Sequence, residues 1–388
     1  MINVAIVGAG IAGVTAAAAL ARAGIPCQVY EQTNEMGEAG AGIQLAPNAT
    51  RLLRRLGDLR LAERAVTPSS IEMRRWDDGN VLATTTLGQA CEDQFGAPYY
   101  TFHRADLHRL LRELLPDGMV VLGRRCDGVR DTPDGAEMVF ADGGTVTADL
   151  VIGADGIHSV VRTLFATDNP RFSGQGIYRG LVPAERMPHM AAEPKVRLWV
   201  GPGRHCVSYP VAAGELINFV ATAPVTDGWR TESWIAPGRV EDLLTGYTGW
   251  HDEVVGLLSE ADSVTQWALH DRDPLEKWSA DRVTLVGDAA HAMLPFAAQG
   301  ANQAIEDAFV LAACLRGADR DAIPAALRQY EALRQPRTAD VQMYSRANQD
   351  TFHLTDETRR QDDGEASLRA QAALFAYDAE AVAASVGG

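Results

Sequence analysis

The stretch that decides the fold is Val-Ala-Ile-Val-Gly-Ala-Gly-Ile-Ala-Gly, residues 4–13. It opens with an apolar run of strand type and leads into an alanine-rich segment of helical type that extends to Ala23. Gly8, Gly10 and Gly13 have the G-x-G-x-x-G spacing, which permits a sharp turn, close approach of a pyrophosphate and tight packing of the helix on the strand. The N-terminus of such a helix supplies N–H donors and positive potential for phosphates.

A second apolar strand, residues 27–30, ends at Glu31, about 20 residues beyond the glycines. A carboxylate at that place accepts hydrogen bonds from a ribose diol and disfavours a 2′-phosphate. We therefore predict a dinucleotide site that includes Glu31 and the adjacent Gln32. This segment alone leaves FAD and NAD open as the dinucleotide, with a purely structural turn as the alternative.

Two later segments repeat the order of buried strand and acidic residue. Residues 150–152 lead to Asp155, and residues 283–286 lead to Asp288 ahead of a predicted helix at 303–315. The repetition suggests that distant segments return to one nucleotide-binding sheet, while the residues between them form a second domain. We predict that Asp155 and Asp288 bind the cofactor.

The middle of the chain changes to a period of two. Residues 195–200 and 204–211 alternate between apolar and polar, and residues 216–222 predict a third strand. An antiparallel sheet of this kind is a natural wall for a substrate chamber beside a nucleotide fold. Beyond Pro336 the sequence predicts helices with an apolar stripe typical of core packing or a dimer contact. The stripe consists of Leu368, Ala372, Phe375 and Val382.

A length of 388 residues, at roughly 150 residues per domain, predicts two or three folding units. We expect an α/β chain whose Rossmann-like domain carries an inserted antiparallel β-sheet substrate domain and C-terminal helices. The expected boundaries are 1–70, 101–175 and 280–330 for the nucleotide-binding domain, 71–100 and 176–279 for the substrate domain, and 331–388 for the C-terminal helical segment.

The amino-acid composition limits the classes of partner that we expect this protein to bind. The 35 basic and 51 acidic residues give a net charge of −16, which repels nucleic acids and anionic lipid surfaces. No apolar run approaches the roughly 20 residues that span a bilayer, and no basic leader is visible at the start. Five cysteines without a CxxC pair indicate reduced thiols and no structural metal. We predict a cytoplasmic protein, monomeric or homodimeric, without nucleic-acid or membrane partners.

The glycine triplet, Asp155-Gly156 and Gly287-Asp288, in that order, closely resemble the single-component (class A) FAD-dependent aromatic hydroxylases over nearly the whole chain. The resemblance implies a GR2-type FAD-binding fold, FAD as cofactor and NADH or NADPH as co-substrate. It also implies hydroxylation of a phenolic aromatic acid, of hydroxybenzoate or salicylate type, with O2 through a flavin C4a-hydroperoxide.

Shorter runs match family members that act on 3-hydroxybenzoate, salicylate and 6-hydroxynicotinate; these runs are residues 40–48, 103–107 and 298–301. The likeness implies that Arg104 reaches the flavin and that Cys126 offers its backbone near the adenine. It also implies that Gly300 and Ala301 cover the pyrimidine edge of the isoalloxazine. A helix N-terminus at that edge stabilises negative charge on the reduced ring.

His205 and Tyr209 match a strand whose His and Tyr face the substrate in two of these relatives. Residues four apart on a strand share a face and lie about 13 Å apart, which is enough to bracket an aromatic ring. His205 is the predicted proton acceptor, because an unperturbed imidazole titrates close to working pH. Tyr209 and Gln44 complete the predicted catalytic set. The predicted substrate-binding residues are Gln299, Tyr99 and Pro295.

Several alternatives stay open. The 6-hydroxynicotinate enzyme has a histidine at the position of Gln44, so a pyridine hydroxylase is one alternative. An FAD-dependent epoxidase, N-hydroxylase or halogenase acting on a larger natural product is a second, and a non-catalytic binding module is a third. Arg104, Arg179 and Arg272 are candidates for pairing with a substrate carboxylate, and the sequence does not choose among them.

Overall fold

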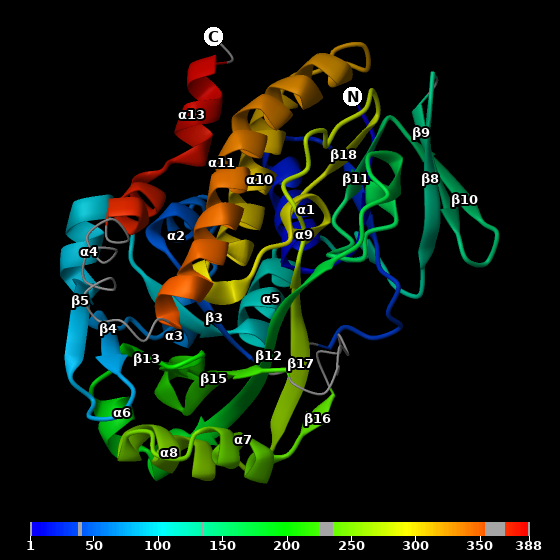
Figure 1. Ribbon diagram of the computed structural model, residues 1–388. Helices are drawn as coiled ribbons and strands as arrows, with labels where there is room; N and C mark the ends of the chain where they lie inside the picture. Colours follow the sequence, from blue (N-terminus) through cyan, green and yellow to red (C-terminus); the bar gives the residue numbers. More distant parts are fainter. Residues whose placement is uncertain (1, 38–40, 134, 226–235, 354–368, 387–388) are drawn as a thin grey trace.

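The computed structural model describes residues 2–37, 41–133, 135–225, 236–353 and 369–386 (Figure 1). Two large sheets dominate the molecule. One is parallel and carries helices, and the other is a broad sheet at the opposite end with two helices over its outer face. The predicted fold class is confirmed.

The parallel sheet has the strand order β18-β11-β1-β2-β7, and all of its neighbouring pairs are parallel. Its strands are β1 (Val4–Val7), β2 (Cys27–Tyr30), β7 (Val120–Val121), β11 (Leu150–Gly153) and β18 (Val283–Leu285). β1, β11 and β18 are buried along their whole length, so their residues are mainly apolar; the exception in β18 is Thr284, whose hydroxyl lies 2.8 Å from Ser279 Oγ. Segments far apart in the chain therefore do return to one sheet, as the repeated strand and acid order predicts.

Three helices pack around this sheet. α1 (Ile11–Arg22) contacts both α10 (Gly300–Cys314) and α5 (Arg104–Glu113). The sequence predicts that α10 starts at Gln303, but the helix begins three residues earlier, at Gly300. Glycine is a poor former of helix interiors, but it is tolerated in the first turn, where N–H groups need no intrahelical partner.

The second sheet has eight strands in the order β16-β17-β12-β15-β14-β13-β4-β5. Its strands are β4 (Ser70–Arg75), β5 (Val81–Thr86), β12 (Arg171–Pro183), β13 (Val196–Gly201), β14 (Arg204–Val211), β15 (Leu216–Pro224), β16 (Pro237–Gly238) and β17 (Val264–Asp271). All pairs are antiparallel except β13 with β4, which run parallel. The alternating pattern marks each strand but not its partner, so this one parallel pair could not be predicted.

Helices α7 (Val240–Gly246) and α8 (Asp252–Ser259) cover the outer face of this sheet (Figure 1). The remaining small sheets are β3 (Gly42–Leu45) with β6 (Tyr100–His103), and β8 (Cys126–Thr132), β9 (Gly135–Phe140) and β10 (Thr145–Ala148). The other short helices are α2 (Pro47–Leu53), α3 (Leu61–Arg64), α4 (Gly88–Phe95), α6 (Pro188–Ala192) and α9 (Asp288–His291).

The C-terminal part consists of α11 (Ile323–Phe352), helical residues 369–376 and α13 (Ala379–Val386). The domain boundary suggested after residue 330 falls inside α11, which also continues through Pro336. Phe375 is buried in an apolar cluster, as the core interpretation of the stripe predicts, whereas Leu368 lies outside the described residues. Within the described ranges, no helix has the length and apolarity needed to cross a membrane.

Candidate active site

The glycine turn is shaped by close packing. Gly8 has a φ of +98°, and a Cβ added there would lie 2.6 Å from the carbonyl oxygen of Ala154. A Cβ on Gly13 would lie 2.0 Å from the carbonyl oxygen of Gly8, so helix α1 reaches the turn only because residue 13 has no side chain. Nothing lies within 4 Å of the Cβ position of Gly10, which faces a cavity.

This first cavity has a volume of about 310 Å³ and lies between the glycine turn, the eight-stranded sheet and the start of α10. Five residues predicted to bind the cofactor line it: Gly10, Arg104, Asp288, Gly300 and Ala301. Because α10 begins at Gly300, N–H groups of its first turn lie at the cavity. The cavity therefore combines a glycine turn, a carboxylate and a helix N-terminus.

Two arginines set the charge of the first cavity. Arg104 and Arg179 both line it, together with the single carboxylate of Asp288. Burial lowers the pKa of Arg179 to about 9, and repulsion from Arg104 acts in the same direction. The Asp288 side chain is exposed to the cavity, but the protein packed around it limits solvation of the carboxylate and raises its pKa, while attraction to His291 and Arg104 opposes that rise. A cavity with this excess of cations suits an anionic group.

Other predicted cofactor residues lie outside the cavity lining. The Glu31 carboxylate accepts hydrogen bonds from the N–H groups of Ala9 at 2.8 Å and Thr33 at 2.9 Å, so it does reach the glycine turn. Gln32 is exposed. Cys126 is buried at the start of β8, and this burial raises the pKa of its thiol to about 11, with a smaller contribution in the same direction from the carboxylate of Asp155.

The carboxylate of Asp155 forms hydrogen bonds within the turn that follows β11. It accepts a hydrogen bond from Ser159 Oγ at 2.5 Å and from the Val160 N–H at 2.8 Å. These bonds hold the turn before the short 3₁₀ helix at residues 161–164. The sequence predicts Asp155 as a cofactor ligand, but its carboxylate is committed to the protein, and its cofactor role stays a prediction.

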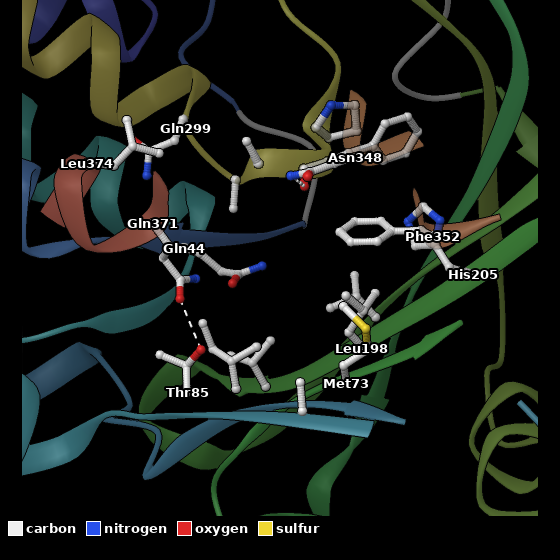
Figure 2. Close-up of a pocket in the computed structure, with 18 of the residues that line it drawn as sticks. Gln44, Met73, Thr85, Leu198, His205, Gln299, Asn348, Phe352, Gln371 and Leu374 are labelled. Carbon is white, nitrogen blue, oxygen red and sulfur yellow. Dashed lines mark hydrogen bonds between the residues drawn. The ribbon is translucent and has the colours of Figure 1, made fainter. Parts of the chain in front are cut away.

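A second, larger cavity of about 550 Å³ adjoins the first (Figure 2). The residues that line both cavities are Gln44, His205, Val207, Pro295, Phe296, Ala298 and Gln299. Strands β4, β5, β13 and β14 form one wall, and α11 with helical residues 369–376 forms another. Predicted substrate residues Gln299, Tyr99 and Pro295 all line this cavity.

His205 lies on β14 at the junction of the two cavities. Its ring packs edge-on against Phe296 and Phe352, with ring centroids 5.0 and 5.3 Å away. Its Nδ1 lies 3.0 Å from Nε2 of His353. Burial lowers the pKa of His205 well below 6.5, and His353 lowers it further, so the imidazole is neutral at working pH.

Gln44, Tyr99 and Tyr209 form a polar cluster beside the junction. The Tyr99 hydroxyl donates a hydrogen bond to Gln44 Oε1 at 2.6 Å. Burial raises the pKa of Tyr209 to about 12, although Arg179 and a hydrogen bond with Gln44 oppose that rise. Both tyrosines therefore keep their protons, and the structure brings the predicted catalytic residues Tyr209 and Gln44 together.

Gln299 is oriented by its neighbours. Its carbonyl oxygen accepts hydrogen bonds from Asn48 Nδ2 and from Gln303 Nε2, each at 3.1 Å. With the oxygen held in this way, the amide NH2 of Gln299 is the group left to donate to a ligand. A fixed donor of this kind at the cavity junction suits an anionic or partly anionic oxygen on a substrate.

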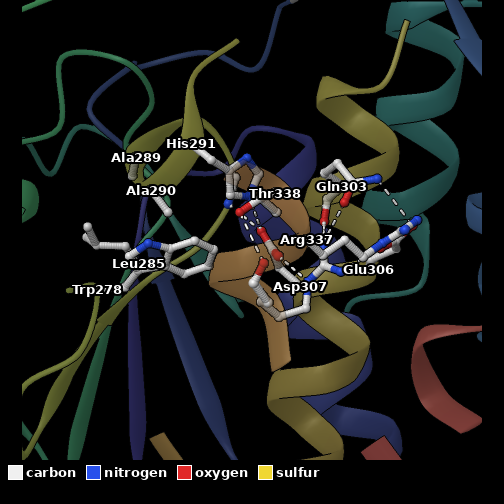
Figure 3. Close-up of polar contacts among 12 residues, drawn as sticks. Trp278, Leu285, Ala289, Ala290, His291, Gln303, Glu306, Asp307, Arg337 and Thr338 are labelled. Carbon is white, nitrogen blue, oxygen red and sulfur yellow. Dashed lines mark hydrogen bonds and ion pairs between the residues drawn. The ribbon is translucent and has the colours of Figure 1, made fainter. Parts of the chain in front are cut away.

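A buried ion network supports the turn that carries Asp288 (Figure 3). The Asp307 carboxylate accepts hydrogen bonds from the Gly287 N–H at 2.9 Å and from Arg334 Nε at 2.8 Å, and it lies 2.6 Å from His291 Nε2. Asp307 and Arg334 are fully buried. The network therefore fixes the backbone immediately before Asp288.

The same network reaches the junction of the cavities through Glu306. Arg334 Nη1 lies 2.5 Å from Glu306 Oε2, and Arg337 Nε lies 2.7 Å from the same oxygen. Asn48 Nδ2 donates to Glu306 Oε1 at 2.7 Å and also to Gln299. The orientation of Gln299 is thus tied to buried charged residues that line neither cavity.

Several lining residues were not assigned from the sequence. Arg179 was one of three candidate arginines, and the structure places it at the first cavity, whereas Arg272 lies elsewhere, paired with Asp168 at 2.9 Å. The unassigned residues of the second cavity include Met73, Leu198, Tyr344, Asn348, Phe352, Gln371 and Leu374. They come from strands and helices that only the folded chain brings together. Phe375, which the sequence predicts as a core residue, is buried in an apolar cluster and also lines this cavity.

Comparison with known proteins identifies the chain. Residues 1–345 match a family described as FAD binding domain. The 3-amino-4-hydroxybenzoate 2-monooxygenase PtnB3 of Streptomyces platensis is 50% identical over 359 residues, which cover 92% of this chain and 90% of that protein. This chain belongs to the FAD-dependent aromatic hydroxylases.

Two further similarities agree with this family. The 3-hydroxybenzoate 6-hydroxylase of Klebsiella oxytoca is 39% identical over 353 residues, which cover 90% of this chain and 88% of that protein. A solved structure described as a salicylate hydroxylase substrate complex has a TM-score of 0.84 at 29% identity, covering 98% of this chain and 97% of the other. The predicted family, cofactor and hydroxylation of an aromatic acid are confirmed.

The first cavity of this hydroxylase fits FAD. Its glycine turn has no room for side chains at Gly8 and Gly13, its arginines complement a pyrophosphate, and α10 points its N-terminus at the space. The Asp288 side chain is exposed and lines this cavity, where its carboxylate is placed to accept a hydrogen bond from a cofactor hydroxyl. The described residues contain no cluster of three or more potential metal ligands.

Replacement of Gly13 by alanine is expected to weaken FAD binding by about ten- to one-hundredfold, because overpacking costs about 1–3 kcal/mol and shifts α1 away from the turn. Flavin fluorescence titration of the apoprotein measures the change. Gly256→Ala in α8 is the matched control, since nothing lies within 4 Å of its Cβ position. Equal FAD affinity of Gly13→Ala and wild type would contradict the packing argument.

Proposed function

We propose that this hydroxylase acts on a small benzoate that carries a hydroxyl group and a neighbouring amino group, and that it oxygenates the ring carbon next to the amine. The observation that carries the proposal is the junction of the two cavities, which His205, Gln44 and Gln299 all line. An imidazole and two amides can accept and donate hydrogen bonds to the polar groups of such a ring. The proposal is supported by the 50% identity with the Streptomyces platensis protein PtnB3, which is named a 3-amino-4-hydroxybenzoate 2-monooxygenase.

The two candidate benzoates differ in which ring substituent activates the carbon that is oxygenated. In 3-amino-4-hydroxybenzoate, carbon 2 is ortho to the amine and meta to the hydroxyl, so the amine activates that carbon. In 3-hydroxybenzoate, carbon 6 is para to the hydroxyl, so the hydroxyl is the activating group. A substrate of the first kind therefore needs its amino side turned toward the first cavity. A 6-hydroxynicotinate substrate remains the alternative that the experiment must separate.

We assign the following roles in this reaction. FAD, reduced by NAD(P)H and reacting with O2, supplies the activated oxygen atom when it is bound. Neutral His205 accepts the proton of the substrate hydroxyl, and the NH2 group of Gln299 donates a hydrogen bond to the same oxygen. The ionised hydroxyl adds electron density to the ring as a whole, and the amine directs the attack to the carbon next to it. Gln44, held by the hydroxyl of Tyr99, orients the ring. The buried setting of these groups excludes water from the reacting edge.

A substrate panel tests the proposal. Purified holoenzyme is incubated with NADH and 3-amino-4-hydroxybenzoate, 3-hydroxybenzoate or 6-hydroxynicotinate, and NADH consumption and product mass are measured. We expect the aminohydroxybenzoate to give the highest kcat/KM and a product heavier by one oxygen atom. Coupled hydroxylation of only the pyridine acid would replace the proposed substrate, and NADH consumption without an oxygenated product would contradict it.

A further inference from the structure

Two histidines from distant parts of the chain form a pair behind the junction of the cavities. His205 belongs to β14, and His353 directly follows the end of α11. Their ring nitrogens Nδ1 and Nε2 lie 3.0 Å apart, and their ring centroids are 5.2 Å apart. His205 is almost fully buried and lines both cavities, whereas His353 is partly exposed and lines neither. The pair therefore leads from the cavity junction toward the outside.

The position of His205 is fixed independently of His353. The backbone N–H of His205 donates a hydrogen bond to Thr222 Oγ1 at 2.8 Å, and the Tyr247 hydroxyl donates one to the backbone carbonyl oxygen of His205 at 2.7 Å. Thr222 Oγ1 also lies 3.5 Å from Nδ1, a longer contact than that with His353. Because Nδ1 is occupied by the second imidazole, Nε2 is the nitrogen left for a ligand in the cavity.

We propose that His353 completes a proton relay in which His205 takes the hydroxyl proton of the substrate and His353 passes a proton on to solvent. The relay rests on the proposed function, because it needs a substrate with an ionisable hydroxyl.

The proton balance is simple. Initially His205 Nδ1–H donates to His353 Nε2. When the substrate O–H bond breaks, its proton binds His205 Nε2, the Nδ1 proton moves to His353 Nε2, and His353 Nδ1 releases its proton to water. The electron pair stays on the substrate oxygen, and both rings end neutral in the opposite tautomer. The reverse sequence returns a proton to the product oxygen and restores the first tautomers.

The electrostatic surroundings favour transfer over storage of the proton. Burial lowers the pKa of His353 to about 4, and the nearby guanidinium of Arg204 lowers it further. His205 is surrounded by Thr222, Phe296 and Phe352, and none of these side chains carries a charge that would stabilise an imidazolium. A lone His205 would thus hold an accepted proton poorly, while two linked neutral rings avoid charging either of them.

Stopped-flow absorbance tests the relay. FAD-loaded His353→Gln and His353→Asn are mixed with 3-amino-4-hydroxybenzoate, and ionisation of the bound hydroxyl is followed together with flavin absorbance, which reports binding. We expect unchanged FAD content, a similar Kd, and ionisation slowed by ~100-fold, the usual cost of a lost acid-base group. Added imidazole should restore part of the rate, because it can replace the missing ring. His189→Gln, at an exposed histidine, is the control.

The outcomes separate the relay from the proposed function. If the ligand binds and ionises in both variants at the wild-type rate, or if imidazole rescues neither variant, the relay is wrong while the substrate stands. If the ligand fails to perturb the flavin of the wild-type enzyme, the proposed substrate is wrong, and the relay falls with it. Wild-type FAD content in either variant shows that the protein is folded, so one folded variant suffices.

Discussion

Replacement of His205 by glutamine is expected to leave FAD bound but to slow hydroxylation by ~100-fold or more, the usual contribution of a positioned general base. Glutamine keeps a polar side chain of similar reach but cannot accept a proton. Alanine would also empty the space between Phe296 and Phe352, which the imidazole ring fills, so its effect would mix chemistry with packing. The glutamine variant therefore isolates the proton-accepting role.

Single-turnover hydroxylation, flavin absorbance and hydrogen peroxide release are the measurements for His205→Gln. We expect NADH consumption to continue with more peroxide and less product. The matched control is His270→Gln, because His270 lies on β17 of the same sheet and lines neither cavity. Normal hydroxylation by His205→Gln would remove His205 from the reaction.

The pH dependence gives a further check on the same residue. Because the folded pKa of His205 is below 6.5, the group stays neutral as the pH falls through that value. We therefore expect no loss of wild-type turnover at pH 6.5 from protonation of this imidazole. Folding lowers the pKa of His205, so the unfolded chain binds the proton at a higher pH than the folded protein does. The free energy of unfolding is therefore expected to fall as the pH drops below 6.5.

Those parts of the site that depend on the pattern within one segment can be predicted from the sequence. The glycine turn, the strand before Asp288 and the shared face of His205 and Tyr209 all follow from spacing within one segment. Lining residues such as Arg179 and Asn348 do not, because β12 and α11 meet the cavities only through long-range packing. No local pattern distinguishes them from other polar residues.

Asp155 shows a second limit of local pattern. An acid after a parallel strand predicts a cofactor ligand, yet this carboxylate holds Ser159 and the Val160 N–H. Spacing identifies where a carboxylate stands, but its hydrogen-bond partners depend on the path of the following turn. The pairing of His205 with His353 is equally invisible in the sequence, because 148 positions separate the two rings.

Replacement of Arg334 by methionine is expected to cost about 3–5 kcal/mol of stability, because removing one member of a buried ion network leaves uncompensated charge. Arg334 joins Glu306 and Asp307, and all three side chains are fully buried. Denaturant unfolding of the holoenzyme measures the loss. FAD affinity should fall as well, because Asp307 holds the Gly287 N–H immediately before Asp288. Arg328→Met, at an exposed position of the same helix, should change neither quantity.

Acid unfolding sharpens the prediction for Arg334→Met. Burial raises the pKa of Asp307, but attraction to His291 and Arg334 outweighs burial and lowers the pKa from 3.8 to about 2. A carboxyl group whose pKa is lowered by folding stabilises the folded state at any pH above the pKa that the group has in the unfolded chain. The contribution of Asp307 is therefore present above pH 3.8 and is lost as the pH falls toward 2. Without Arg334 the depression shrinks, and the acid midpoint should move to higher pH. An unchanged midpoint together with unchanged stability would show that the network is not a stabilising link between α10 and α11.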